Sequence, residues 1–127
     1  MATEAEKVFA YRDYCEQVRL AAYQVLASQI GRLGPRYGGH GVGFVQPLSS
    51  SHWLFEPQGA YLNVRMPQSR EQETIQVTIG VRQGWKPVVS VASNSRDPVT
   101  IESIGDAQAD IEQVKLEIRK CLEGLGL

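Results

Sequence analysis

Apolar residues recur at spacings of three and four through the first third of the chain. This spacing predicts one long amphipathic helix. Thr3 and Glu6 match a capping box at its start, and Gly31, Gly34 and Pro35 are predicted to end it. The residues on the apolar stripe are Tyr11, Tyr14, Cys15, Val18, Ala22, Val25, Leu26, Ile30 and Leu33.

Glycines interrupt the pattern after this helix, and six of the twelve glycines lie between residues 31 and 43. Because glycine loses the most backbone freedom on ordering, we predict a loop without regular structure from Gly34 to Ser51. We expect this loop to be the most mobile internal segment of the free protein. An edge strand formed by Val42, Phe44 and Val45 is the alternative.

Alternating apolar and polar residues in the middle of the chain predict β-strands. The predicted strands are residues 52–55, 60–66, 74–82, 87–92 and 99–103. Polar turns are expected at residues 67–73 and 93–98. Because these connections are too short for crossover helices, consecutive strands should pair antiparallel.

A second helical stripe ends the chain, and Ser103 or Asp106 can cap it. Leu116 falls on the polar side of this predicted helix. The stripe is formed by Ala107, Ile111, Val114, Ile118, Cys121 and Leu125.

The element order is therefore one helix, four or five strands and one helix. Each element has one apolar face to bury, which favours an α+β two-layer sandwich with both helices on one face of an antiparallel sheet. The length of 127 residues fits a single domain spanning residues 1–127. The predicted core contains Val18, Val25, Ile79, Ile111, Val114 and Ile118.

Composition and charge narrow the class of protein. Hydrophobic residues make up 43% of the chain, a composition that excludes a disordered tail and a coiled coil. The formal charge of −1 gives no electrostatic reason to expect a nucleic-acid clamp. No apolar stretch approaches a membrane span, and the first residues are acidic, unlike a signal peptide. We expect a cytoplasmic protein that does not bind membranes. Cys15 and Cys121 lie on the helical stripes and are predicted to be buried thiols rather than a disulfide.

No motif for catalysis, metal binding or cofactor binding is apparent. His40 and His52 are the only histidines, too few for a metal site at any suitable spacing. The glycine-rich segment lacks the P-loop and dinucleotide-binding spacings, and it follows a helix rather than preceding one. We therefore predict no catalytic residues, no cofactor and no metal.

Two surfaces remain as candidates for recognition. Strand alternation places Tyr61, Asn63, Arg65, Thr74, Gln76, Thr78 and Arg82 on the sheet face that the helices leave open. The glycine-rich loop offers Arg36, Tyr37 and His40, and Trp53 and Trp85 flank predicted strand ends. The predicted partner-binding residues are Arg36, Tyr37, His40, Tyr61, Arg65, Arg82 and Trp85.

By elimination, the sequence favours a non-enzymatic protein-interaction module that binds and blocks, or escorts, a partner protein. A homodimer is expected, because the sheet has an open face and an open edge. One alternative is a nucleic-acid-binding adaptor that uses the open face and the loop. Another is a small-molecule sensor with a pocket between helix and sheet, walled by Trp53, Tyr14 or Trp85.

Overall fold

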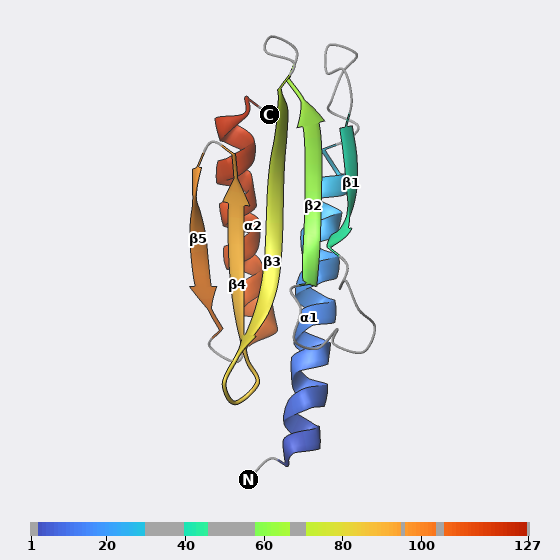
Figure 1. The fold of residues 1–127 in the computed structure, drawn as a ribbon, viewed down its shortest axis with the longest axis vertical. Helices are drawn as coiled ribbons and strands as arrows, with labels where there is room; N and C mark the ends of the chain where they lie inside the picture. The colour runs from blue at the N-terminus through green and yellow to red at the C-terminus, as the bar shows by residue number, and fades with distance from the viewer. Residues whose placement is uncertain are drawn as a thin grey trace.

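The fold is an α+β sandwich of two layers (Figure 1). The computed structural model describes residues 3–29, 40–45, 58–66, 71–94, 96–103 and 106–126. These residues form two helices and five strands. In chain order they are α1 (Glu4–Ala27), β1 (His40–Val45), β2 (Gln58–Arg65), β3 (Gln72–Arg82), β4 (Lys86–Ser93), β5 (Arg96–Glu102) and α2 (Ala107–Gly124).

The strands form one open antiparallel sheet in the order β1-β2-β3-β4-β5, so each strand pairs with its neighbour in sequence. Both helices lie behind the same face of this sheet (Figure 1). Helix α1 packs mainly on β2, whereas α2 packs on β4 and β5. The predicted sandwich with both helices on one face is confirmed.

The core lies between the two layers. Of the six predicted core residues, Val18, Ile79, Val114 and Ile118 are at most 1% exposed and Ile111 is also buried. Val25 is only half-buried at the margin of the core. The alternation of apolar residues along the strands and their helical spacing therefore identified the buried faces of both layers.

Helix α1 begins after Thr3, whose hydroxyl oxygen accepts a hydrogen bond from the backbone N–H of Glu6 at 3.2 Å, as the capping box predicts. The helix ends at Ala27, before the glycines that the sequence suggests as its end. There the hydroxyl of Ser28 donates to a carbonyl of the last turn at 2.7 Å. Serine side chains that bond the backbone in this way compete with continued helix.

Strand β1 lies where glycine density predicts a loop, so that prediction is wrong for His40–Val45, and the alternative of an edge strand is correct. Val42 and Phe44 point toward the helix layer and pack against the core. The Phe44 ring stacks on Tyr23, with ring centroids 4.5 Å apart, and the Arg19 guanidinium lies 4.9 Å from its centroid. These contacts outweigh a backbone cost of about 0.5–1 kcal/mol for each glycine.

Two predicted turns are shorter than expected. Gln72 and Glu73 belong to β3, while Asp97 and Pro98 belong to β5. Proline is tolerated there because β5 is an edge strand, where one side of the backbone needs no partner.

Helix α2 is capped by Asp106, whose carboxylate accepts hydrogen bonds from the backbone N–H groups of Gln108 and Ala109. Cys121 on its inner face is buried, as is Cys15 on α1, and both are free thiols. The predictions for Asp106 as the cap and for the two thiols are therefore confirmed.

One charged side chain of α2 is buried. Only 5% of the Glu117 side chain is exposed, and its carboxylate lies 3.6 Å from the Arg96 guanidinium and 3.3 Å from the Lys120 ammonium. Gln113 also donates a hydrogen bond to it. This cluster joins α2 to β5 beneath the sheet.

Several predictions fall outside the described residues. They concern the strand at residues 52–55 with Trp53, the loop residues Arg36 and Tyr37, and the mobility of the segment from Gly34 to Ser51, except where β1 occupies it.

Candidate functional site

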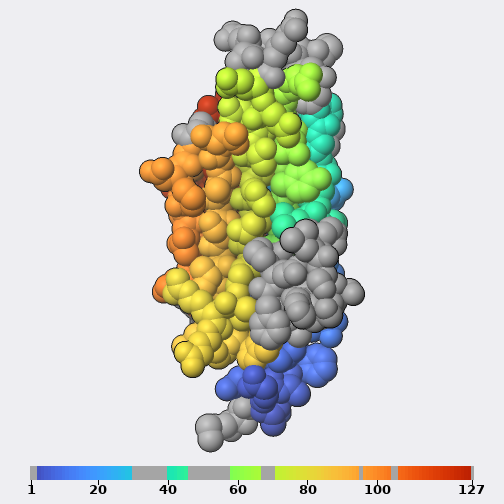
Figure 2. Space-filling model, viewed as in Figure 1, coloured from blue at the N-terminus to red at the C-terminus, as the bar shows by residue number. Residues whose placement is uncertain are grey.

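Side chains that point away from the helices form a surface that we call the open sheet face (Figure 2). The register places Tyr61 beside Gln76 on the central strand, and Thr78 beside Ser90 on β4. The residues of this face are Tyr61, Asn63, Arg65, Thr74, Gln76, Thr78, Arg82, Lys86, Val88, Ser90, Ala92, Thr100 and Glu102.

The centre of the open sheet face carries uncharged side chains in the part of the chain that the structure describes. The Thr74 hydroxyl donates a hydrogen bond to the Asn63 amide oxygen at 2.7 Å. Tyr61 lies across β1 at Gly43, where a built Cβ would come within 2.7 Å of the tyrosine hydroxyl oxygen. Glycine at this position therefore leaves room for the Tyr61 ring over β1, toward one side of the face.

Charged residues lie at the two ends of the same face. Arg65 is at the end of β2, whereas Arg82 and Lys86 flank the β3–β4 turn at the opposite end. Arg82 forms an ion pair with Glu102 at 2.6 Å, so one of these cations is already neutralised. The face is therefore neutral in the middle and charged at its margins.

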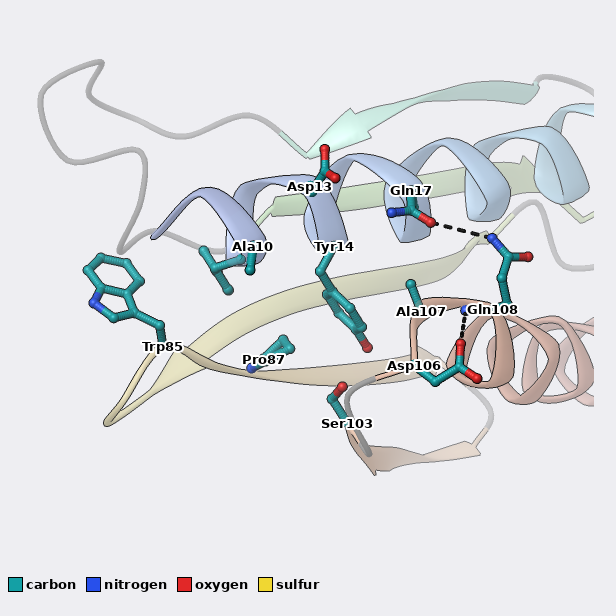
Figure 3. A pocket seen from close by; sticks show the side chains of 11 residues that line it. Ala10, Asp13, Tyr14, Gln17, Trp85, Pro87, Ser103, Asp106, Ala107 and Gln108 are labelled. Atoms are coloured by element: carbon teal, nitrogen blue, oxygen red, sulfur yellow. Dashed lines mark hydrogen bonds between the residues drawn. The ribbon is translucent and has the colours of Figure 1, made fainter. Parts of the chain in front are cut away.

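A cavity of about 460 Å³ lies on the other layer of the molecule, between α1, the start of α2 and the β3–β4 turn (Figure 3). We call it the aromatic cavity. It is lined by Ala10, Tyr11, Asp13, Tyr14, Gln17, Trp85, Pro87, Ser103, Asp106, Ala107 and Gln108.

Trp85 bounds one side of the aromatic cavity from the last position of the β3–β4 turn (Figure 3). Its φ of 61° is in the left-handed region, which bulky residues rarely adopt. The indole ring packs on Tyr11, with ring centroids 5.8 Å apart and planes tilted by 52°. Its N–H donates a hydrogen bond to the Glu4 carboxylate. These contacts hold the indole against α1 despite the unfavourable backbone conformation.

Tyr14 joins the two helices at the inner side of the cavity. Its hydroxyl donates a hydrogen bond to the Asp110 carboxylate at 2.8 Å, and both side chains are buried. Burial, followed by the hydrogen bond to Asp110, raises the pKa of Tyr14 above its usual value, while a hydrogen bond with Ser103 acts in the opposite direction. The phenol therefore stays protonated as a donor.

Two aspartates, one from each helix, are among the residues that line the cavity, but the Asp13 carboxylate points away from Tyr14 and Asp106 (Figure 3). Asp13 comes from α1 and makes no ion pair or hydrogen bond with another described residue. Asp106 comes from the start of α2 and caps it. No Lys, Arg or His is present among the described lining residues.

The predicted partner-binding residues separate into three places. Tyr61, Arg65 and Arg82 lie on the open sheet face. Trp85 lines the aromatic cavity instead, as does Tyr14, where the small-molecule alternative places a helix–sheet pocket. His40 begins the edge strand β1, at an exposed position beside a second hollow that Arg65 also lines.

Sequence reasoning missed the acidic residues of the cavity. Asp106 was identified only as a helix cap, and Asp13 was given no role. Tyr14 and Asp110 are 96 positions apart, so no local pattern connects them. The signal available for Asp110 was its position on the apolar side of the second predicted helix, one turn after the helix begins.

Titratable groups in the described part of the chain form no recognisable catalytic centre. Burial raises the pKa of Cys15 from 9.0 to about 11, which leaves the thiol protonated near neutral pH and poorly nucleophilic. No group of three or more His, Cys, Asp or Glu among the described residues could hold a metal ion.

Comparison with known proteins identifies no relative: no family model, curated protein or solved structure matches the chain. Neither described helix is long and apolar enough to cross a membrane. The open sheet face and the aromatic cavity are therefore the two candidate functional surfaces.

Proposed function

We propose that this protein is a non-enzymatic protein-interaction module that binds, and blocks or escorts, a partner protein through its open sheet face. The observation that carries the proposal is the distribution of charge on that face. Its centre carries the uncharged Gln76 and Thr78, and Tyr61 lies beside them over β1. The charged residues Arg65, Arg82, Lys86 and Glu102 lie at the ends. Protein interfaces have the same arrangement, with charged residues depleted at the centre and an amphipathic aromatic residue within it.

The size of the face supports a weak, reversible complex. Rows of about nine residues on five strands measure about 27 Å by about 20 Å, or about 540 Å². Two such surfaces bury about 1,100 Å² in total, close to the lower limit of about 1,000 Å² for a specific interface.

A second copy of the chain is the first partner to test. The hydroxyl and amide groups of Thr78, Ser90 and Gln76 can each donate and accept hydrogen bonds, so the face can complement a copy of itself. The formal charge of −1 adds little repulsion between copies. The free, buried thiols of Cys15 and Cys121 support a cytoplasmic location.

A photo-cross-linking amino acid in place of Gln76 tests the proposal in living cells. Gln76 lies at the centre of the face, and Gln24 on the exposed side of α1 is a matched control position. We expect a protein adduct from position 76 and not from position 24. An adduct of twice the chain mass identifies a second copy, whereas a heavier one identifies another protein. Equal labelling from both positions, or none from position 76, would contradict the proposal.

The substitution Gln76→Arg tests the same interface in purified protein. It introduces a charge at the centre of the face, which costs free energy when the interface is desolvated. If copies associate, light scattering from about 10 to about 500 μM should show a dimer that Gln76→Arg weakens and Gln24→Arg does not. Binding to single-stranded nucleic acid that falls steeply with salt would instead favour the nucleic-acid alternative.

A further inference from the structure

We propose that the outer edge of β1 pairs antiparallel with the same edge of a second copy of the chain, so that two five-stranded sheets join into one. This surface is the rim of the sheet and is distinct from the open sheet face. The inference does not depend on the proposed use of that face, because a pair joined at β1 leaves the face out of the contact.

The two edges of the sheet differ in how well they resist pairing (Figure 1). At one edge, β5 carries the exposed Asp97 and Glu102, has Pro98 without a backbone N–H, and pairs irregularly with β4. Charge, proline and irregularity are the features by which edge strands avoid pairing with other chains. At the other edge, β1 contains no proline, aspartate, glutamate, lysine or arginine, and all six of its residues pair in unbroken register with β2. The β1 edge is therefore the one that can accept another strand.

The hairpin between β2 and β3 shows which backbone groups of β2 point toward β1. The N–H of Met66 donates to the Glu71 carbonyl oxygen at 2.9 Å, so the backbone groups of Met66 point toward β3. These groups alternate in direction along a strand. Asn63 therefore directs its N–H and C=O toward β1, where its partner is Gly41.

The same alternation gives the groups on the outer edge of β1. His40, Val42 and Phe44 direct their N–H and C=O away from β2, and no described strand pairs with this edge. An antiparallel pair centred on Val42 places His40 of each copy opposite Phe44 of the other. This Val42-centred pair uses all the outward groups in about six backbone hydrogen bonds, and a shift of register by two residues would use fewer.

Gly41 has no described contact and no backbone conformation that requires glycine. A built Cβ at Gly43 would come within 2.7 Å of the Tyr61 hydroxyl oxygen, whereas one at Gly41 meets no described atom within 4 Å. The φ of Gly41 is not in the left-handed region. In the Val42-centred pair, Gly41 lies opposite Gly43 of the second copy, with Cα atoms about 4.5 Å apart. The Tyr61 ring that crosses that Gly43 then points toward Gly41, which supplies a reason for glycine at both positions.

The helix layer at the same edge contains an unsatisfied polar group. The Arg19 Nε is buried and has no hydrogen-bond partner among the described residues, and the guanidinium lies 4.9 Å from the Phe44 ring centroid. In the Val42-centred pair, His40 of the second copy lies opposite Phe44 on the same side of the joined sheet. A neutral imidazole accepts a hydrogen bond through one ring nitrogen, so His40 of the second copy can satisfy Arg19.

The two copies of α1 fit on the joined sheet. Helix α1 packs mainly on β2, and the two β2 strands would be separated by three strand spacings, or about 14 Å. This distance exceeds the usual helix separation of about 8–10 Å. The stacked rings of Phe44 and Tyr23 lie over β1 and help to fill the space between the helices.

Oxidative cross-linking tests the register. The pair places the Cα atoms of the two Val42 residues about 5.5 Å apart, which is within the range of about 4.4–6.8 Å that a disulfide spans. We expect diamide to convert Val42→Cys into a disulfide-linked dimer and the wild type, whose two cysteines are buried, to stay unlinked. Thr100→Cys on β5 is the matched control at the opposite edge. Because Thr100 is more exposed than Val42, random collisions would link Thr100→Cys first. Equal linking of both variants, or no dimer from Val42→Cys, would overturn the proposal.

The substitution Gly41→Val tests the contact without a cross-link. Light scattering of the wild type from about 10 to about 500 μM should show a dimer. Gly41→Val should weaken the association by about tenfold or more, because its side chain obstructs Tyr61 of the second copy. Its melting temperature should not fall, since valine favours strands and meets no described atom there. Gly80→Val on β3 is the control, because a Cβ there also has no atom within 4 Å. A monomeric wild type, or unchanged association in Gly41→Val, would contradict the proposal.

Gln76→Arg separates the failure of this proposal from a failure of the open sheet face. A dimer that Gly41→Val weakens and Gln76→Arg leaves intact supports pairing at β1. A dimer that only Gln76→Arg weakens overturns pairing at β1 and supports association through the face. The adduct expected from position 76 is a separate result, because Gln76 lies on β3 and outside the β1 contact.

Discussion

Two arginines on the strands allow a direct comparison of a buried and an exposed ion pair. Arg96 approaches the Glu117 carboxylate, whose side chain is 5% exposed. Arg82 pairs with Glu102, and their side chains are 58% and 71% exposed. The distances alone suggest the opposite ranking, since the exposed pair is at 2.6 Å and the buried pair at 3.6 Å. We predict that Arg96→Ala destabilises the protein much more than Arg82→Ala.

The magnitudes follow from solvation. An exposed pair contributes about 0–1 kcal/mol, because water and salt screen it and two long side chains must be ordered. Removing Arg96 leaves the Glu117 charge buried, which costs several kcal/mol when a charge has no other partner. Lys120 and Gln113 stay in contact with that carboxylate, so the expected cost is about 1–3 kcal/mol.

Urea unfolding of the two variants measures the difference. The slope of the unfolding free energy against urea concentration should stay unchanged, while the urea midpoint of Arg96→Ala should fall. Its melting temperature should decrease by about 3–10 °C for a domain of this size. The double variant Arg96→Ala/Glu117→Gln should recover part of the loss, because the buried charge has been removed. Equal destabilisation by Arg82→Ala and Arg96→Ala would refute the reasoning.

Two further predictions concern a glycine of β2 and the buried thiol of α1. Gly59→Ala should destabilise the protein by about 2 kcal/mol or more, because a Cβ there would lie 1.7 Å from the Val77 carbonyl oxygen. Gly80→Ala is the control and should change the unfolding free energy little, because a Cβ at that position has no atom within 4 Å. Burial raises the pKa of Cys15 from 9.0 to about 11, so the contribution of this thiol to stability is complete below pH 9 and is lost as the pH rises toward 11. In chemical unfolding curves, Cys15→Ala should therefore reduce the loss of stability between pH 9 and pH 11. An unchanged pH dependence of stability in Cys15→Ala would contradict this prediction.

The sequence was sufficient to predict the fold class, because both layers have regular apolar periodicity. The stripe of α2 and the alternation along β3 placed Ile118, Val114 and Ile79 in one core. Errors occurred where long-range contacts outweigh local preference. The stacking of Phe44 on Tyr23 favours a strand in the glycine-rich β1, which the sequence offered only as the alternative to a loop.

The candidate sites were predictable to different degrees. The open sheet face follows from strand alternation, so Tyr61, Arg65 and Arg82 were placed there correctly. The aromatic cavity depends on how α1, α2 and one turn meet, and sequence reasoning identified only Tyr14 and Trp85 as candidate walls. Its lining side chains are distant in sequence, and only the fold brings them together.

The positions of the two sites explain why one small domain can carry both. The two helices pack on one sheet face, and no described helix or strand lies on the opposite face (Figure 1). The aromatic cavity arises on the helix layer, where α2 begins and the β3–β4 turn brings Trp85 against Tyr11. Gln76 and Asp13 therefore lie on different layers, and substitutions at them should act additively. If Asp13→Asn alters the effect of Gln76→Arg, the two layers are coupled through the sheet, and β3 is the element that connects Gln76 to the Trp85 turn.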